Sequence, residues 1–216
     1  MTREEIKTLL SSFKQEDFYK DVDLHIHSNE SDGEMSPYEI FDQSRRRGMR
    51  YIAIADHNTI DAYLSTNILR EEIVIPAVEF DCLYKGVFVH ILGYGIDIDN
   101  KELKSLYSKD KLGKNHNLFR LLSLRNPKEV IEKINNAGGV AVLAHPCCYW
   151  TTNLDSFIGE FAQMGIEGVE VYYNYHGLRK IVKFHSEHIV SSIADKYNLI
   201  KTGGTDTHGK ELMTLV

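Results

Sequence analysis

The sequence has few cysteines, no long apolar run and no excess of basic residues. Its three cysteines, Cys82, Cys147 and Cys148, are too few for a disulfide framework, and two are adjacent, so reduced thiols are expected. No segment approaches the roughly 18 apolar residues that a membrane helix needs. The first residues, MTREEIKTLL, lack the apolar core of a secretory signal. These absences predict a cytoplasmic protein that does not bind a membrane.

The charge balance excludes a further class of partner. Acidic residues outnumber basic residues by 31 to 25, which gives a formal net charge of -6. Avid, non-specific binding of nucleic acid needs a concentrated basic surface, so we expect no stable nucleic-acid complex. A local site could still bind a phosphate group if metal ions supplied the positive charge.

The chain of 216 residues fits one domain, and short apolar segments that end in polar residues alternate along it with helical segments. Strands are expected over residues 22–26, 51–55, 73–78, 87–89, 140–144, 168–173 and 199–202. This alternation predicts a parallel α/β sheet. In a closed α/β barrel the carboxyl ends of the strands build the active site. An open, doubly wound sheet gives the same alternation, so the pattern alone leaves both architectures open.

Two helices between the predicted strands carry clear start and stop signals. Ser36-Pro37-Tyr38-Glu39 is a capping box with proline at the first helical position, and Gly48 fits the end of that helix. Asn126-Pro127 opens a second helix, which Gly138 closes. Residues from about 97 to 125 break the pattern and are interpreted as an excursion over the barrel mouth. Its lysines could contact a polyanionic substrate, although a solvated surface insertion is the favoured interpretation.

Histidines and carboxylates gather at the predicted strand ends. His25 and His27 lie two apart on a strand, so both imidazoles project from one face and can approach the same ion. Equivalent positions at or just beyond strand ends hold His57, His90, His145, His208, Glu79, Asp32 and Asp206. Such a mixture suits zinc, manganese or iron, and the lack of clustered cysteines disfavours a structural zinc site. Without metal the cluster would leave charges unpaired, which is costly, so a metal site is predicted.

The order of these motifs resembles a known family. DLHIHS followed by SDG, then ADHNTI, AVEF, VHILGY, LAHP and GGTDTH match successive motifs of the PHP (polymerase and histidinol phosphatase) family. The resemblance covers residues from about 21 to 209 and is strongest to the small stand-alone phosphoesterases. It implies a single PHP domain over residues 1–216, with the excursion at about 97–125, folded as a distorted (β/α)7 TIM-like barrel.

The resemblance also implies two or three divalent metal ions (Mn, Fe or Zn). One ion would be held by His25, His27, Glu79 and Asp206. Glu79 would bridge to a second ion, completed by His90 and His145, and a third would be held by Asp32, His57 and His208. Every one of these positions carries a residue able to ligate. A metal-bridging hydroxide would then hydrolyse a phosphate ester, with Glu79 and Asp206 as catalytic residues.

Substrate contacts are sought after the sixth predicted strand, where the family places a substrate-binding histidine. The spacing fits either His176 or His185, and we favour His176 in a catalytic and substrate-binding role. His185 and Arg179 are further substrate-binding candidates. Some relatives carry a phosphate-binding arginine after the His-Pro motif, but this chain has Cys147-Cys148-Tyr149-Trp150 there.

Several other side chains near the motifs have two interpretations. Tyr149 and Trp150 could stack on a base or sugar, and packing at the barrel rim is the favoured alternative. Arg120 and Arg125 are further phosphate candidates in the excursion. Asp56, which precedes a ligand histidine, either orients the ligands or has a structural role.

The implied activity is metal-dependent hydrolysis of a phosphate ester on a nucleotide, an oligonucleotide or a small phosphorylated metabolite. A metallohydrolase of the amidohydrolase type is one alternative, because it also uses a His-x-His strand. Those enzymes usually have a lone aspartate after the last strand, whereas Asp206 is followed by His208. A non-catalytic, metal-stabilised binding module is the other alternative, and the intact ligand set argues against it.

Overall fold

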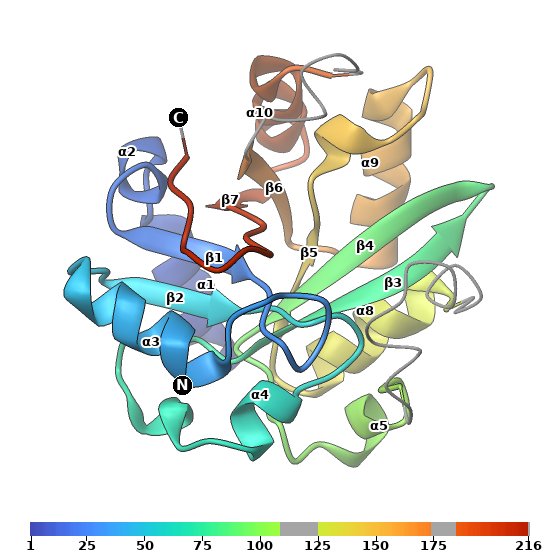
Figure 1. The fold of residues 1–216 in the computed structure, drawn as a ribbon. Coiled ribbons are helices and arrows are strands. Elements are labelled where there is room, and N and C mark those ends of the chain that lie inside the picture. Colours follow the sequence, from blue (N-terminus) through green and yellow to red (C-terminus); the bar gives the residue numbers. More distant parts are fainter. Residues whose placement is uncertain (109–124, 174–184, 216) are drawn as a thin grey trace.

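The computed structural model describes residues 1–108, 125–173 and 185–215, in which seven strands form two sheets (Figure 1). The strands are β1 (Val22–Ile26), β2 (Tyr51–Ile54), β3 (Ala77–Tyr84), β4 (Val87–Tyr94), β5 (Val140–Leu143), β6 (Gly168–Tyr173) and β7 (Ile200–Gly204). One sheet pairs β1 with β2, and the other has the order β3-β4-β5-β6-β7. Each predicted strand overlaps an observed one, but β3 begins at Ala77 instead of residue 73, β4 runs on to Tyr94, and the pairing differs from the prediction.

The helices lie between and around these strands. They are α1 (Arg3–Ser12), α2 (Gln15–Phe18), α3 (Pro37–Arg46), α4 (Asp61–Leu64), α5 (Lys101–Lys104), α8 (Pro127–Asn136), α9 (Leu154–Met164) and α10 (Glu187–Lys196). Two short 3-10 helices cover Ile68–Arg70 and Pro146–Cys148. Within the described ranges, no helix has the length and apolar character that crossing a membrane requires.

The helix signals in the sequence are confirmed. The Ser36 hydroxyl accepts a hydrogen bond from the Glu39 N–H, and the Glu39 carboxylate accepts one from the Ser36 N–H, so the capping box starts α3. Asn126 caps α8 through its side chain. Gly48 and Gly138 follow these helices with φ of +69° and +74°, a backbone region that glycine enters without strain.

The predicted all-parallel sheet is wrong around β4. This strand is antiparallel to both β3 and β5, whereas the pairs β1/β2, β5/β6 and β6/β7 are parallel. The physical reason is the two-residue turn Lys85-Gly86, in which both residues have positive φ. Such a turn joins antiparallel strands and is far too short for the crossover that parallel strands need. The long green hairpin in Figure 1 is the result.

The predicted closed (β/α)7 barrel is not what the strand pairing forms. Neither of the two sheets is closed, and isolated bridges connect them at Ile26–Thr207, Ile52–Val74 and His57–Glu79. On one side, the His27 N–H donates to the Thr207 carbonyl at 3.0 Å, which holds the end of β1 beside the segment after β7. The fold is thus a mixed α/β arrangement whose irregular bridges bring distant strand ends together.

An apolar cluster lies under α1, and we refer to it as the α1 cluster. It comprises Ile6 and Leu10 of α1 together with strand residues that include Leu24, Ala53, Ala77, Leu92, Tyr94 and Val142. Helix α1 packs against β5 and β7. Gly95 permits this close approach, because a Cβ atom there would lie 2.4 Å from Cγ1 of Ile6. The helix therefore covers the strands, and its side chains Ile6 and Leu10 are fully buried.

Candidate metal centre

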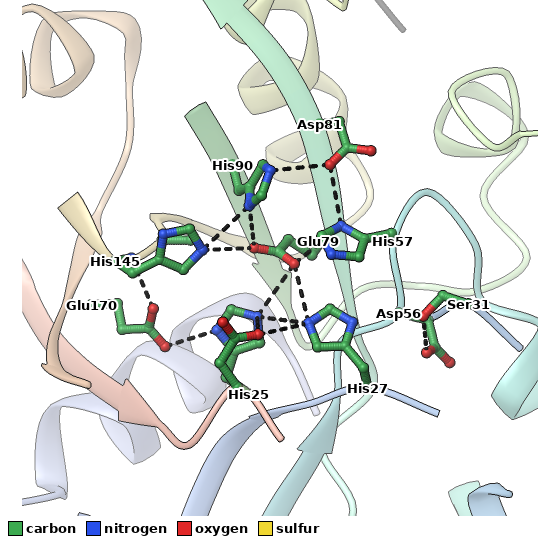
Figure 2. A network of polar contacts seen from close by, with 12 residues as sticks. His25, His27, Ser31, Asp56, His57, Glu79, Asp81, His90, His145 and Glu170 are labelled. Atoms are coloured by element: carbon green, nitrogen blue, oxygen red, sulfur yellow. Dashed lines mark hydrogen bonds and ion pairs between the residues drawn. The ribbon is translucent and has the colours of Figure 1, made fainter. Parts of the chain in front are cut away.

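All nine predicted ligands meet in one site, which we call the histidine cluster: His25, His27, Asp32, His57, Glu79, His90, His145, Asp206 and His208. Figure 2 shows the imidazoles of His25, His27, His57, His90 and His145 around the carboxylate of Glu79. Their elements are distant in sequence but adjacent in space, as the predicted gathering of strand ends requires. Their role as metal ligands remains a prediction.

Glu79 is the centre of this cluster. Its Oε1 lies 3.0 Å from Nδ1 of His90 and 3.2 Å from Nε2 of His145. Its Oε2 lies 3.3 Å from Nε2 of both His25 and His27. Nδ1 of His57 also lies 3.2 Å from Oε2. The two carboxylate oxygens therefore face separate groups of imidazoles, as a carboxylate shared between two ions would.

A second group lies to one side of Glu79. Asp32 places Oδ1 3.3 Å from Nε2 of His208 and Oδ2 3.8 Å from Nε2 of His57. His27, Asp32, His57 and His208 together offer ligand atoms within 4.8 Å of one another. This set includes all three residues that the sequence assigns to a third ion.

His90 corrects one detail of the sequence interpretation. It was expected just beyond a strand ending at residue 89, but β4 continues to Tyr94 and His90 lies within it. Likewise, Glu79 is the third residue of β3 rather than the residue that follows a strand. Because β3 and β4 form a hairpin, both predicted ligands lie within strands, and Asp81 of β3 lies opposite His90.

The residues present fit metal ions on several observations. Nε2 of His25 and Nε2 of His27 lie only 3.1 Å apart, close enough for both nitrogens to bind one ion. Among the described residues, Oε2 of Glu79 and Nδ1 of His27 are buried without a hydrogen bond. Two ligand atoms about 2.1 Å from one ion lie about 3–3.5 Å apart, which matches these separations. Buried polar atoms of this kind are costly unless something coordinates them.

Without metal, protons would have to balance the carboxylates. Burial disfavours charge on His27, but hydrogen bonding to Asp206 and Glu79 outweighs it and raises the pKa of His27 to about 9. Burial is likewise outweighed at His90, where Glu79 and Asp81 raise the pKa to about 8. Burial prevails at His57 and lowers its pKa to about 4. Binding of metal ions would therefore displace protons from the histidines whose pKa is raised.

Two of the predicted ligands have strained backbones. His145 has φ of +25° and Asp206 has φ of +53°, both in the region that residues with a side chain rarely adopt. The Asp206 N–H donates to the His25 carbonyl at 2.7 Å, and the Tyr173 hydroxyl donates to Oδ2 of Asp206 at 2.6 Å. Strain of this kind persists only where surrounding contacts compensate it, and it is common at functional sites.

Sequence reasoning missed two buried carboxylates that contact the ligands. Oε1 of Glu170, on β6, lies 2.9 Å from Nδ1 of His25, and Oε2 accepts the His145 N–H at 2.8 Å. Asp81, on β3, contacts His57 and His90. The available signal for Asp81 was its spacing, because residues two apart on a strand share a face and Asp81 follows Glu79 at that distance.

Asp56 has the structural role that the sequence left open. Its carboxylate accepts hydrogen bonds from the Ser28 N–H at 2.7 Å, the Ser28 hydroxyl at 2.6 Å and the Ser31 hydroxyl at 2.5 Å. These bonds fix the loop that follows β1 and leads to Asp32. Asp56 therefore orders the path of the chain between two groups of predicted ligands.

The predicted substrate contacts are only partly described. His176, Arg179 and Arg120 lie outside the described residues. His185 lines a cavity of about 390 Å³ between the starts of α9 and α10, together with Asp155 and His188. That cavity contains none of the nine predicted ligands, so the choice between His176 and His185 stays a prediction.

Two other candidates prove to be structural. Arg125 donates from Nε and Nη2 to the Leu106 carbonyl, at 2.9 and 2.7 Å, and its guanidinium lies over the Phe80 ring. Tyr149 is buried, and its hydroxyl donates to the Ala144 carbonyl at 2.6 Å, which confirms the packing alternative. Trp150, in contrast, is 79% exposed.

These features define an α/β protein with a buried metal site of histidines and carboxylates. The PHP domain model matches residues 23–201, and the chain belongs to that family. A phosphoribosyl 1,2-cyclic phosphate 1,2-diphosphodiesterase of Eggerthella lenta is 23% identical, over 87% of this chain and 94% of the relative. A 3′,5′-nucleoside bisphosphate phosphatase of Chromobacterium violaceum is 24% identical, over 87% of each chain.

Solved structures agree with this assignment at the level of the fold. An amidohydrolase from Chromobacterium violaceum, with bound sulfate and no metal, matches with a TM-score of 0.72 at 22% identity over 88% of both chains. A candidate metal-dependent phosphoesterase from Bifidobacterium adolescentis matches with a TM-score of 0.71 at 20% identity over 90% of both chains. Because these identities are low, the likeness concerns the fold alone.

Proposed function

We propose that this protein is a metal-dependent phosphoesterase. The observation that carries the proposal is the shared carboxylate of Glu79, whose two oxygens face separate groups of imidazoles. Family membership and the names of the two relatives support phosphate esters as the substrate class. We expect two or three divalent ions, either Mn, Fe or Zn, because imidazole and carboxylate ligands suit all three metals.

The residues of the histidine cluster would hold these ions and position the reacting groups. Divalent ions in such a site activate water near neutral pH and neutralise charge on phosphoryl oxygens. Glu79 fixes the spacing between two ligand groups, since one rigid carboxylate serves both. Tyr173 holds Oδ2 of Asp206 and leaves Oδ1 facing His27 at 3.1 Å. The chain thus orders its ligands before substrate arrives, which lowers the reorganisation needed for reaction.

The two sheets are, on this proposal, parts of one distorted (β/α)7 barrel. The isolated bridges at Ile26–Thr207 and His57–Glu79 support it, because they lie where a closed ring would join the sheets. The convergence of ligands from β1, β3, β4 and the segments after β2, β5 and β7 supports it as well. In such barrels one face carries the catalytic groups.

For the substrate, we favour a small ribose phosphate or nucleotide in the cytoplasm. The relatives from Eggerthella lenta and Chromobacterium violaceum are named for such compounds. A 5′-3′ exoribonuclease of Haemophilus influenzae is also similar, at 29% identity over 55% of this chain. The net charge of -6 disfavours tight binding of long nucleic acid, so a nucleotide or a short oligonucleotide is the better expectation.

Metal content and hydrolysis test this proposal together. Protein purified without chelator should contain two to three equivalents of Mn, Fe or Zn by elemental mass spectrometry. It should release phosphate from a 3′,5′-nucleoside bisphosphate, and Asp206→Ala should abolish that release while the protein stays folded by circular dichroism. A chain that takes up none of the three metals would contradict the proposal. Turnover of a lactone or amide, with none of phosphate esters, would favour the amidohydrolase alternative.

A further inference from the structure

Asp81 occupies an unusual place behind the histidine cluster. It lies on β3 two residues after Glu79, and its side chain is fully buried. Its Oδ1 lies 3.2 Å from Nδ1 of His57 and 3.2 Å from Nε2 of His90. Figure 2 shows this carboxylate joined to both rings, on the side away from His25 and His27. One oxygen therefore serves two imidazoles that come from different elements.

The two imidazoles belong to different groups of predicted ligands. The other nitrogen of His90, Nδ1, lies 3.0 Å from Oε1 of Glu79 and 3.3 Å from Nε2 of His145. The other nitrogen of His57, Nε2, faces Asp32 at 3.8 Å. Asp81 is thus placed where it contacts the rear nitrogen of one histidine from each group.

Asn58 fixes the orientation of this carboxylate. Nδ2 of Asn58 donates a short hydrogen bond to Oδ2 of Asp81, and the Asp81 N–H donates to Oδ1 of Asn58 at 3.1 Å. The Asn58 N–H also donates to the Glu79 carbonyl at 2.8 Å. With Oδ2 held in this way, Oδ1 is directed toward the two imidazoles.

Glu79 is the other carboxylate near His57, and the two compete for Nδ1. Oε2 of Glu79 also lies 3.2 Å from that nitrogen, and Nδ1 meets hydrogen-bond geometry with neither carboxylate. On the proposed function, however, Glu79 is engaged by metal ions. Asp81 is then the carboxylate that remains to accept from Nδ1 of His57.

We propose that Asp81 is a positioning residue that accepts from Nδ1–H of His57 and Nε2–H of His90, and so presents the opposite nitrogen of each ring to a different metal ion. This inference rests on the proposed function. An anionic acceptor fixes the tautomer and orientation of a ligating histidine and increases its basicity. Here a single carboxylate does so for two ligand groups, which links their metal affinities.

The variant Asp81→Asn tests the inference with little change in volume. Because Asn58 donates to the Oδ2 position, the new amide would turn its oxygen toward Asn58 and its NH2 group toward the imidazoles. The NH2 group of the amide would then face the N–H groups of His57 and His90, and donors cannot pair with donors. Both histidines would therefore lose their preferred tautomer. Loss of such an outer contact weakens metal binding by about 10–100-fold. We expect two stepwise Zn²⁺ affinities of the metal-free protein, measured by competition with a chromophoric chelator, to fall by that factor.

A charge-conserving double variant provides the rescue. In Asn58→Asp/Asp81→Asn the amide and the carboxylate exchange places, so the amide NH2 donates to the new carboxylate and its oxygen again faces the imidazoles. Asn58 has φ of +56°, a conformation that aspartate also tolerates. We expect this variant to recover most of the lost Zn²⁺ affinity. Glu167→Gln is the control for loss of a carboxylate charge, because Glu167 pairs with Arg3 and Lys7 instead of an imidazole.

The possible outcomes separate the inference from the function on which it rests. Unchanged Zn²⁺ affinities in Asp81→Asn, with hydrolysis of phosphate esters by the wild type, would overturn the inference alone. Complete loss of one ion without rescue by the double variant would also overturn it, since Asp81 would then be a direct ligand. Failure of the wild type to bind Zn²⁺, Mn²⁺ or Fe²⁺ would remove the proposed function itself.

Discussion

The histidine cluster and the α1 cluster are built from the same strands but are stable for opposite reasons. Leu24 and His25 are neighbours on β1, yet the first belongs to the α1 cluster and the second faces Glu79. The α1 cluster gains free energy from removing apolar surface from water. In the histidine cluster, buried charges are tolerated only because each is compensated by another charge, a proton or an ion.

This difference shows which cluster depends on groups from solution and which does not. The apolar cluster needs the correct volume and no partner from solution. The polar cluster keeps atoms such as Oε2 of Glu79 buried without a hydrogen bond. Bound metal ions would satisfy these atoms. Substitutions in one cluster should therefore change stability, and substitutions in the other should change metal binding and activity.

The largest effect is expected from Glu79→Gln. This change removes the negative charge that both ligand groups share, so metal content and activity should fall together. Loss of a single stabilising group in an active site costs about 10²–10³-fold in rate, and we expect at least that loss here. The comparison predicts that the variant still folds, because the α1 cluster is untouched. Phosphate release and elemental mass spectrometry measure the effect; full metal content with normal turnover would contradict it.

The next largest effect is expected from Leu10→Ala in the α1 cluster. Leu10 is fully buried, and truncating such a side chain lowers the free energy of unfolding by about 2–5 kcal/mol. Metal stoichiometry at a temperature where the protein is folded should not change. Thr8→Ala, on the exposed face of the same helix, should change stability by no more than about 0.5 kcal/mol. Urea denaturation of the three proteins provides the measurement, and loss of metal from folded Leu10→Ala would break the comparison.

The sequence predicted the residues of the histidine cluster better than the buried carboxylates that contact them. The nine predicted ligands were identifiable because each stands in or beside a short motif such as DLHIHS or GGTDTH. Asp81 and Glu170 were missed because they lie inside β3 and β6, where no strand end marks them. Their role depends on which imidazoles the fold brings beside them, and that is a tertiary property.

The topology was predictable only where local signals decide it. The capping box at Ser36 fixes the start of α3 by hydrogen bonds between neighbours, so the sequence was sufficient. The direction of β4 depends on the turn at Lys85-Gly86, which was not recognised as a hairpin signal. The approach of Ile6 to Gly95 joins residues far apart in the chain, and no local sequence pattern predicts it.

The last prediction concerns pH and distinguishes the two clusters directly. The pKa values of His27 and His90 are raised to about 9 and about 8 from an ordinary value of 6.5. The folded, metal-free protein thus binds these protons more tightly than the unfolded chain does. The resulting stability is complete below pH 6.5 and is lost as pH rises through about 8 and 9. The free energy of unfolding of the metal-free protein should therefore decrease over that range.

Metal-loaded protein should lack this decrease, because an ion then replaces the protons on the ligand nitrogens. Thermal denaturation with and without a chelator, followed by circular dichroism from pH 6.5 to 9, provides the test. Leu10→Ala should displace the metal-free curve to lower stability without altering its slope, since the α1 cluster carries no titrating group of its own in this range. Equal slopes in the presence and absence of metal would show that protons on His27 and His90 do not balance the buried carboxylates.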